Sequence, residues 1–288
     1  MICNPFDHHR PTTVQDAVAV LDRPAGEVTV LGGGTMLIPS MTLGHVKVDC
    51  LLELTALGLD TVTVEHGHLC LGALTSYADI LRSERVAQHA PILRAMADVV
   101  TGGPSILNQG TLGGSACFGN PASDLPACLV VLDAELELAS TAGMRRVAAR
   151  DFFLGPFQTA RRKNELLARI LIPLRDATQV ARYTKYKSCA SSWPIVTVAC
   201  VLYQRGPDPW TLALSVGAAA GIPTFHAFTG DVQALRAPEA WVDAAVRQAC
   251  AAVGPGWSDE LADASYRRAI VPGAVTRMLR NVLQEVST

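Results

Sequence analysis

The sequence predicts an α+β protein in two parts, and three observations support this prediction. Short runs with strand character alternate irregularly with capped helical patterns up to residue 173. The apolar periodicity is then lost across residues 175–178, directly after Pro173, as is typical of a domain boundary. Three strand patterns and then three helical patterns follow, and they predict a three-stranded sheet with a helical bundle. We therefore expect domains at residues 1–176 and 177–288.

The first domain begins with a small α/β unit at residues 1–56. Thr12 and Gln15 form a capping box, and the apolar residues after them share one helical face, which predicts a helix. Short β-branched runs then predict strands, because such side chains favour a pleated backbone. These expected strands are residues 28–31 and 46–54.

The rest of the first domain, residues 57–176, opens with a hairpin that turns at a glycine within residues 61–71. Ser76 and Asp79 predict the capped start of a helix. Pro91 begins a second helix, since proline is tolerated in the first helical turn. We expect a further helix at residues 125–132 and strands at residues 135–139 and 165–172.

The second domain follows the same rules of periodicity. Its expected strands are residues 181–186, 195–203 and 210–216, and its expected helices are residues 238–252, 258–264 and 272–286.

Composition limits the functions open to this chain. Its 288 residues are long enough for two domains, and 49% hydrophobic with 17% charged residues is ordinary for a globular protein. A net charge of −2 argues against a nucleic-acid partner or an anionic membrane surface. No apolar stretch reaches the length of a membrane span, and the N-terminus has no apolar signal core. We therefore expect a cytoplasmic protein.

Two glycine-rich segments indicate a ligand. Residues 101–124 contain six glycines and no regular apolar period. Each glycine costs roughly 0.5–1 kcal/mol relative to alanine, so a cluster implies a constraint such as a ligand lying against bare backbone. Gly113, Gly114 and Ser115 have the composition of a nest, in which successive N–H groups bind a phosphate. A strand that ends in residues 32–35 (GGGT) offers a second nest, so we predict a site for two phosphates.

Glycine pairs also have a structural interpretation. Gly102 and Gly103 precede Pro104 and are predicted to stop the preceding helix. Neither segment is a P-loop or has the G-x-G-x-x-G spacing of a dinucleotide-binding crossover. Met36, Leu37 and Met41 are interpreted as the core face of a short helix rather than as a stripe facing a cofactor. 

The sequence offers no convincing metal site. The eight cysteines are scattered without a C-x-x-C pair, which indicates reduced thiols and no iron–sulfur cluster. His66 and His68 have no third ligand nearby and are interpreted as exposed turn residues. Cys117 lies within the glycine-rich segment, where it either approaches the ligand or fills a buried gap. Asp124 likewise has two interpretations, as a helix N-cap or as an acceptor for a ligand hydroxyl.

These motifs resemble the FAD-binding medium subunits of the molybdenum hydroxylase family, of the carbon monoxide dehydrogenase and xanthine dehydrogenase type. The resemblance covers nearly the whole chain. It rests on ordered motifs at residues 6–11 (FDHHRP), 31–39 (LGGGTMLIP), 111–115 (TLGGS), 120–126 (NPASDLP), 165–173 (ELLARILIP) and 265–267 (SYR). It implies a two-part FAD-binding domain of the PCMH/vanillyl-alcohol-oxidase type, followed by a C-terminal flavoprotein domain.

The resemblance also implies the residues that bind FAD, with no catalytic residue and no metal ligand on this chain. The first segment contributes Gly32, Gly33, Gly34, Thr35, Met36 and Leu37, and the second contributes Thr111, Gly113, Gly114 and Ser115. Asp124 and Lys185 are assigned to the sugar alcohol or the ring, and Trp193 to one flavin face. Met36 stands where the family usually has Ser, Asp or Asn, and Cys189 where it usually has Arg.

The function implied by the resemblance is electron transfer within a heterotrimer. A large subunit would carry a molybdenum–pterin cofactor, and a small subunit two [2Fe–2S] clusters. FAD on this chain would pass the electrons to NAD, oxygen or a quinone-linked carrier, and a dimer of heterotrimers is compatible with this arrangement. Two alternatives stay open: a self-contained flavin oxidoreductase of the same fold, and a flavin-free assembly subunit.

Overall fold

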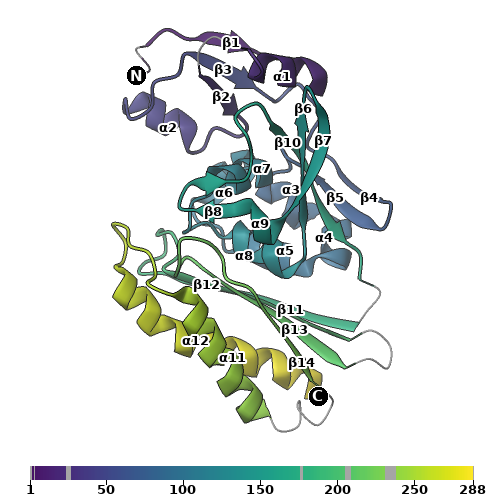
Figure 1. Cartoon of the computed structure of the whole chain (residues 1–288), viewed down its shortest axis with the longest axis vertical. Helices are drawn as coiled ribbons and strands as arrows, with labels where there is room; N and C mark the ends of the chain where they lie inside the picture. Colours follow the sequence, from purple (N-terminus) through teal and green to yellow (C-terminus); the bar gives the residue numbers. More distant parts are fainter. Residues whose placement is uncertain are drawn as a thin grey trace.

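The computed structural model describes residues 2, 4–23, 27–175, 178–204, 209–230 and 238–287. Within these residues the strands form three main sheets and a two-stranded ribbon. The three sheets belong to three tiers, which follow one another along the longest axis of the molecule (Figure 1). We call them the first, middle and third tiers, in chain order.

The first tier is a parallel sheet in the order β1-β3-β2. Its elements are β1 (Asp7–His9), α1 (Val14–Leu21), β2 (Val28–Leu31), α2 (Leu37–Thr42) and β3 (Cys50–Glu53). The strand predicted at residues 28–31 is confirmed, whereas the one predicted at 46–54 is shorter. The predicted capping box is wrong by one residue, because the Thr13 hydroxyl accepts from the Asp16 N–H and begins α1.

The middle tier is an antiparallel sheet with helices packed against it. Its strands in sheet order are β4 (Val62–Glu65), β5 (His68–Gly72), β10 (Leu166–Pro173), β6 (Glu135–Ser140) and β7 (Gly143–Ala148). Its helices are α3 (Tyr77–Arg82), α4 (Glu84–His89), α5 (Pro91–Asp98), α6 (Gly103–Gln109), α7 (Leu112–Phe118), α8 (Leu125–Val131) and α9 (Ala149–Phe152). β8 (Phe153–Gly155) pairs with β9 (Gln158–Thr159) in the small ribbon. The capping box at Ser76 and Asp79 and the helix start at Pro91 are confirmed.

The second glycine-rich segment is more regular than expected, because it contains α6 and α7. Gly102 has a left-handed backbone with φ of 115° and is the N-cap of α6. The predicted helix stop at Gly102 and Gly103 is therefore wrong: α5 has already ended at Asp98, with Val99 as its C-cap.

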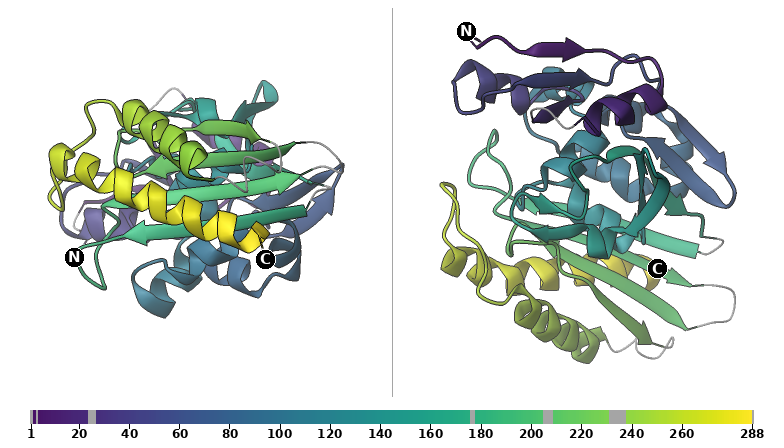
Figure 2. Two further views of the ribbon diagram at one scale, coloured as in Figure 1. Left: turned by 90° about the horizontal axis from the view of Figure 1, so that it is seen from below. Right: turned by 45° about the horizontal axis from the view of Figure 1, so that its top comes forward.

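The third tier is an antiparallel sheet covered on its outer face by two helices (Figure 2). Its elements are β11 (Thr178–Tyr186), β12 (Val196–Gln204), β13 (Trp210–Gly217), β14 (His226–Gly230), α11 (Pro238–Val253) and α12 (Ala264–Ser287). The three-stranded prediction is wrong, since β14 adds a fourth strand within the described residues. The predicted helix at residues 258–264 is also wrong, because that segment is irregular and α12 begins only at Ala264.

The inner face of the third tier packs on the middle tier. Ala199, Val201 and Ala213 of its sheet belong to the same buried cluster as Leu129 and Val130 of α8. The largest core of the molecule therefore joins these two tiers. Among the described residues, no helix combines the length and apolar character needed to cross a membrane.

Two buried carboxylates, Glu137 and Glu165, hold segments of the middle tier together. Glu137 on β6 accepts from Arg146 on β7 at 3.0 Å and also pairs with Arg169 on β10. Burial alone would raise the pKa of Glu137, but the hydrogen bonds from Arg169 and Arg146 outweigh it and the pKa is lowered. Arg145 donates to both oxygens of Glu165, at 2.6 and 2.8 Å. These pairs fix the strands behind the cavity described next.

Candidate functional site

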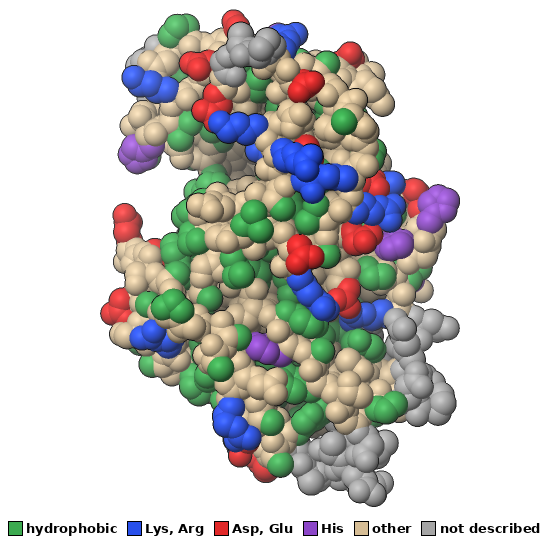
Figure 3. All heavy atoms as spheres, viewed as in Figure 1, with side chains coloured by type: hydrophobic (Ala, Val, Ile, Leu, Met, Phe, Trp, Pro, Cys, Tyr) green, Lys and Arg blue, Asp and Glu red, His purple; other side chains and the backbone are tan. Residues whose placement is uncertain are grey.

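A cavity of about 610 Å³ lies where the three tiers meet. Its wall comes from residues 27–37 of the first tier, from several segments of the middle tier and from Ser191, Trp193 and Pro194 of the third. Figure 3 shows the molecular surface hollowed between the first tier and the rest of the molecule. Cavities of roughly 300–1,000 Å³ are typical of small-molecule and cofactor sites.

The first glycine run leaves β2 and forms one side of the cavity. Gly33 lies so close to the second segment that an added Cβ would be 1.6 Å from the carbonyl oxygen of Gln109. Gly34 has φ of +73°, which favours glycine. The backbone N–H groups of Gly33, Gly34 and Thr35 donate to no residue that the structure describes. They are therefore available to an acceptor in the cavity, as a nest requires.

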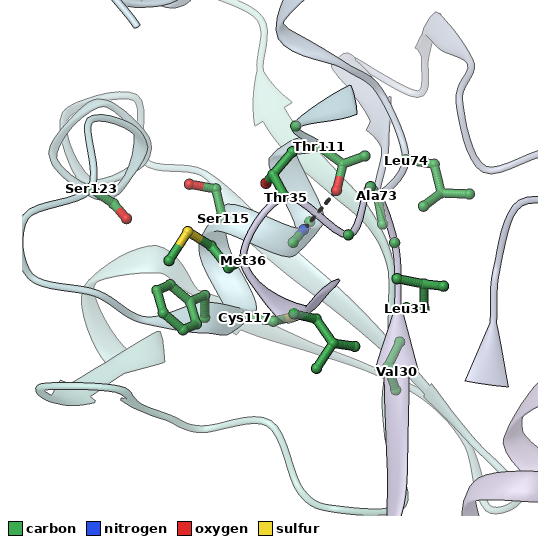
Figure 4. Close-up of a pocket in the computed structure, with 18 of the residues that line it drawn as sticks. Val30, Leu31, Thr35, Met36, Ala73, Leu74, Thr111, Ser115, Cys117 and Ser123 are labelled. Carbon is green, nitrogen blue, oxygen red and sulfur yellow. Dashed lines mark hydrogen bonds between the residues drawn. The ribbon is translucent and has the colours of Figure 1, made fainter. Parts of the chain in front are cut away.

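The second glycine run does not form the expected nest. Gly113, Gly114 and Ser115 lie in the first turn of α7, and their N–H groups donate to Ala73 O, Thr111 Oγ1 and Thr111 O at 2.8, 3.1 and 3.0 Å. An added Cβ on Gly113 would lie 2.6 Å from Ala73 O, so close helix packing explains this glycine. The second run instead contributes the side chains of Thr111 and Ser115, which line the cavity (Figure 4).

Asp124 lines the cavity at the start of α8, where it makes no side-chain cap. Asp124 therefore occupies the N-cap position of α8, as predicted, but its side chain does not cap the helix. Its Oδ1 accepts from the Tyr183 hydroxyl at 2.6 Å, and its Oδ2 accepts from Lys185 Nζ at 3.1 Å. Lys185 does not line this cavity; it lies behind Asp124 and also donates to Thr101 Oγ1 at 3.0 Å.

Trp193 comes from the third tier and is partly exposed at the cavity wall. The backbone after it is fixed by Arg267 of α12, which is fully buried and donates to the carbonyl oxygens of Ile195 and Ala218 at 2.8 and 2.7 Å. The Thr101 hydroxyl donates to Ser192 O at 3.1 Å from the other side. Arg267 thus fixes the segment that carries Trp193 within the third tier, and Thr101 joins it to the middle tier.

All the predicted site residues except Lys185 therefore line one cavity. Sequence reasoning missed three lining residues in particular, which are Leu74, Tyr77 and Arg161. Tyr77 directly follows the Ser76 cap that the sequence does reveal; burial raises its pKa to about 12, and it hydrogen-bonds Ser115. No local pattern distinguishes Leu74 or Arg161 as site residues.

The structure also places the methionines, leucine and cysteines that the sequence analysis singled out in or near the glycine-rich segments. Met41 is buried and Leu37 packs against its cluster, so the predicted core face holds for these two residues, although Leu37 also lines the cavity. Met36 is exposed at the cavity wall and does not belong to this core face. Cys117 lines the cavity, and burial raises its pKa to about 11, so the thiol stays protonated. Cys189 is exposed in the loop before Trp193.

His66 is exposed in the turn between β4 and β5, as predicted, and His68 begins β5. The described cysteines are free, and no group of three candidate metal ligands occurs among the described residues.

The fold and the cavity are those of a small-molecule-binding protein, and comparison with known proteins identifies the family as flavin-binding. The model of the FAD binding domain in molybdopterin dehydrogenase matches residues 4–175. The chain belongs to this family and is a flavoprotein subunit of the oxidoreductase type.

The curated relatives include the carbon monoxide dehydrogenase medium chain of Afipia carboxidovorans, with 33% identity over 93% of both chains. The glyceraldehyde dehydrogenase medium chain of Sulfolobus acidocaldarius is 32% identical over 74% of this chain and 75% of its own length. Among solved structures, reconstituted CO dehydrogenase from Oligotropha carboxidovorans matches with a TM-score of 0.89, 30% identity and 99% coverage of both chains. The fold and the recognition made from sequence motifs are thus confirmed.

Proposed function

We propose that this chain binds one FAD in the 610 Å³ cavity and passes electrons from a partner subunit to an external acceptor. The observation that carries the proposal is the first glycine run, where the N–H groups of Gly33, Gly34 and Thr35 have no acceptor among the described residues. Three adjacent donors suit the negative charge of a diphosphate. The residues present therefore fit FAD, with Thr111 and Ser115 supplying hydroxyl groups beside it.

Two other lining residues suit the sugar alcohol and the ring system. Asp124 offers a carboxylate acceptor, and Trp193 offers an aromatic side chain for one ring face. The bound flavin would supply the redox chemistry by accepting and releasing electrons. The chain's own residues hold it, orient it and limit its contact with water.

The relatives support a proposal about partners, because they are named medium chains of dehydrogenases. We propose a small iron–sulfur subunit that delivers electrons and a large subunit that holds the molybdenum cofactor. NAD, oxygen or a quinone-linked carrier would accept the electrons. We also propose that residues 1–176 form the FAD-binding domain and residues 177–288 the C-terminal domain.

The test starts with the isolated chain. We expect a flavin absorbance spectrum and, because we assign no covalent tether, release of all the flavin into the supernatant after acid precipitation. A spectrum without flavin would favour the assembly subunit, and flavin retained in the pellet would contradict noncovalent binding.

Addition of the iron–sulfur and molybdenum subunits with the hydroxylase substrate should then bleach the flavin. Turnover of a small organic substrate by the chain alone would instead favour a self-contained oxidoreductase.

A further inference from the structure

Lys185 and Asp124 form a buried ion pair between the third and middle tiers. Lys185 is on β11 and its side chain is 2% exposed, while the Asp124 side chain at the start of α8 is 10% exposed. Lys185 Nζ donates to Asp124 Oδ2 and to Thr101 Oγ1, at 3.1 and 3.0 Å. Tyr183, on the same strand, donates to the other Asp124 oxygen at 2.6 Å. Hydrogen bonds therefore fix the orientation of both the Lys185 ammonium and the Asp124 carboxylate.

The pair joins residues that line two different cavities. Asp124 lines the 610 Å³ cavity assigned to FAD, and Lys185 lines a second cavity of about 540 Å³. The second cavity is also lined by Lys187, Thr184 and Ala190, and Thr101 contributes to both walls. The Asp124–Lys185 contact is thus a direct polar connection between the walls of the two cavities, one hydrogen bond long.

We propose that Lys185 and Asp124 carry protons between the second cavity and the FAD cavity. This inference rests on the proposed function, because flavin takes up protons when it is reduced and releases them when it is oxidised. The Lys185 ammonium gives a proton to the Asp124 carboxylate, which gives it to an acceptor in the FAD cavity. The Lys185 amine then regains a proton from water in the second cavity. The iron–sulfur subunit supplies the electrons, and the reverse transfer accompanies reoxidation.

The surroundings favour this pair for proton transfer over its neighbours. Burial raises the pKa of Asp124 and lowers the pKa of Lys185, so the two values approach each other and a shared proton moves at a smaller cost. The other groups facing Asp124 are Tyr183, Tyr77, Cys128 and Lys187.

Burial raises the pKa of the Tyr183 and Cys128 side chains well above their usual values and that of Tyr77 to about 12. These three groups therefore stay protonated near neutral pH. Lys187 is exposed and donates to Ala190 O at 2.7 Å. It is a second cation in the wall of the second cavity, but it makes no hydrogen bond to Asp124.

The experiment follows proton uptake separately from flavin reduction in the isolated, FAD-loaded chain. A reduced viologen, whose oxidation releases no proton, delivers the electrons in weakly buffered solution. Flavin bleaching and the colour of a pH indicator are recorded together in a stopped-flow instrument. Asp124→Asn and Lys185→Met remove one member each, and the double variant removes both charges so that no unpaired buried ion strains the fold. Lys187→Met is the matched control.

We expect proton uptake to accompany bleaching in the wild type and in Lys187→Met. In the double variant the rate of proton uptake should fall about 10²-fold below that of the wild type, which is the lower end of what a positioned acid or base contributes. Unchanged proton uptake in a double variant that still binds FAD would overturn the relay and leave a purely structural ion pair. A chain that binds no FAD in any form would overturn the proposed function, and the relay with it.

Discussion

Gly33 is the residue at which the two glycine segments meet. A Cβ at this position would lie 1.6 Å from Gln109 O and 2.6 Å from Gln109 C, both of which are backbone atoms. Backbone cannot rotate away as a long side chain can, so the whole loop must retreat. The absence of a side chain thus sets the distance between the N–H donors of this loop and the opposite wall of the cavity.

We predict that Gly33→Ala yields a protein without bound flavin. The added methyl should also lower the free energy of unfolding by about 1–3 kcal/mol, the usual cost of overpacking. Flavin content per protein and urea unfolding measure the two effects.

The control is Gly273→Ala in α12, where an added Cβ meets no atom within 4 Å. That variant should keep its flavin. Its free energy of unfolding should rise by about 0.5–1 kcal/mol, because alanine is the better helix former. A Gly33→Ala protein with a full complement of FAD would show that the first run does not hold the diphosphate.

At the scale of elements, α7 depends on one hydroxyl. Thr111 Oγ1 accepts from the Gly114 N–H at 3.1 Å and caps a helix whose first turn contains two glycines. We predict that Thr111→Ala lowers the free energy of unfolding by about 1 kcal/mol, as expected for the loss of an N-cap. Thr111→Ser should retain most of this stability, because serine keeps the capping hydroxyl. Thermal unfolding of both variants measures the difference between them. Equal losses in the two variants would exclude the capping role.

β6 is held to both of its neighbours by Glu137, whose partners Arg146 and Arg169 are on β7 and β10. Because the folded pKa of Glu137 is lowered, the unfolded chain binds more protons as the pH falls. The stability from this carboxylate is complete above the unfolded pKa of about 4.3 and is lost as the pH falls through the lower folded value.

We predict that Glu137→Gln lowers the free energy of unfolding at neutral pH by about 1–3 kcal/mol, less than for a fully buried pair because both arginines are partly exposed. The variant should also lose less stability than the wild type between neutral pH and pH of about 3.5. Glu135→Gln serves as control, since Glu135 also contacts Arg146 but is 40% exposed. Its effect should stay below about 1 kcal/mol. Urea unfolding at both pH values tests this, and equal effects of the two substitutions would refute it.

Local signals explain which elements could be predicted from the sequence. The strand at residues 28–31, the Ser76 cap and the Pro91 helix start each depend on residues adjacent in the chain. α7 could not be predicted in this way, because the reason for Gly113 is its close packing against Ala73, which lies in a different segment of the chain. β14 was missed for a similar reason, since its pairing with β13 rather than a strong period defines it.

The site shows the same division. The glycine runs and Asp124 were visible as motifs, whereas the separation of Lys185 from the main cavity depends on how β11 packs against α5. The spacing of Tyr183 and Lys185 does put both on one strand face, so their joint contact with Asp124 had a readable signal.

At the scale of the whole molecule, all three tiers contribute to one cavity, so a ligand there should stabilise the complete fold. We predict that removal of FAD lowers the midpoint of thermal unfolding. Addition of FAD at 100 times its dissociation constant should raise the free energy of unfolding of the apoprotein by about 2.7 kcal/mol. Riboflavin, which has no diphosphate, should restore much less. Differential scanning calorimetry of the apoprotein with each compound tests this, and equal rescue by riboflavin would contradict the role given to Gly33, Gly34 and Thr35.

The contact between Arg267 and the carbonyl oxygen of Ile195 also has a consequence for biosynthesis. A ribosome releases the N-terminus first, so both glycine segments emerge long before α12 exists. Until Arg267 has been translated, the loop bearing Trp193 has no anchor on that side. Because we propose that Trp193 covers one flavin face, we expect stable flavin binding only after α12 has been translated.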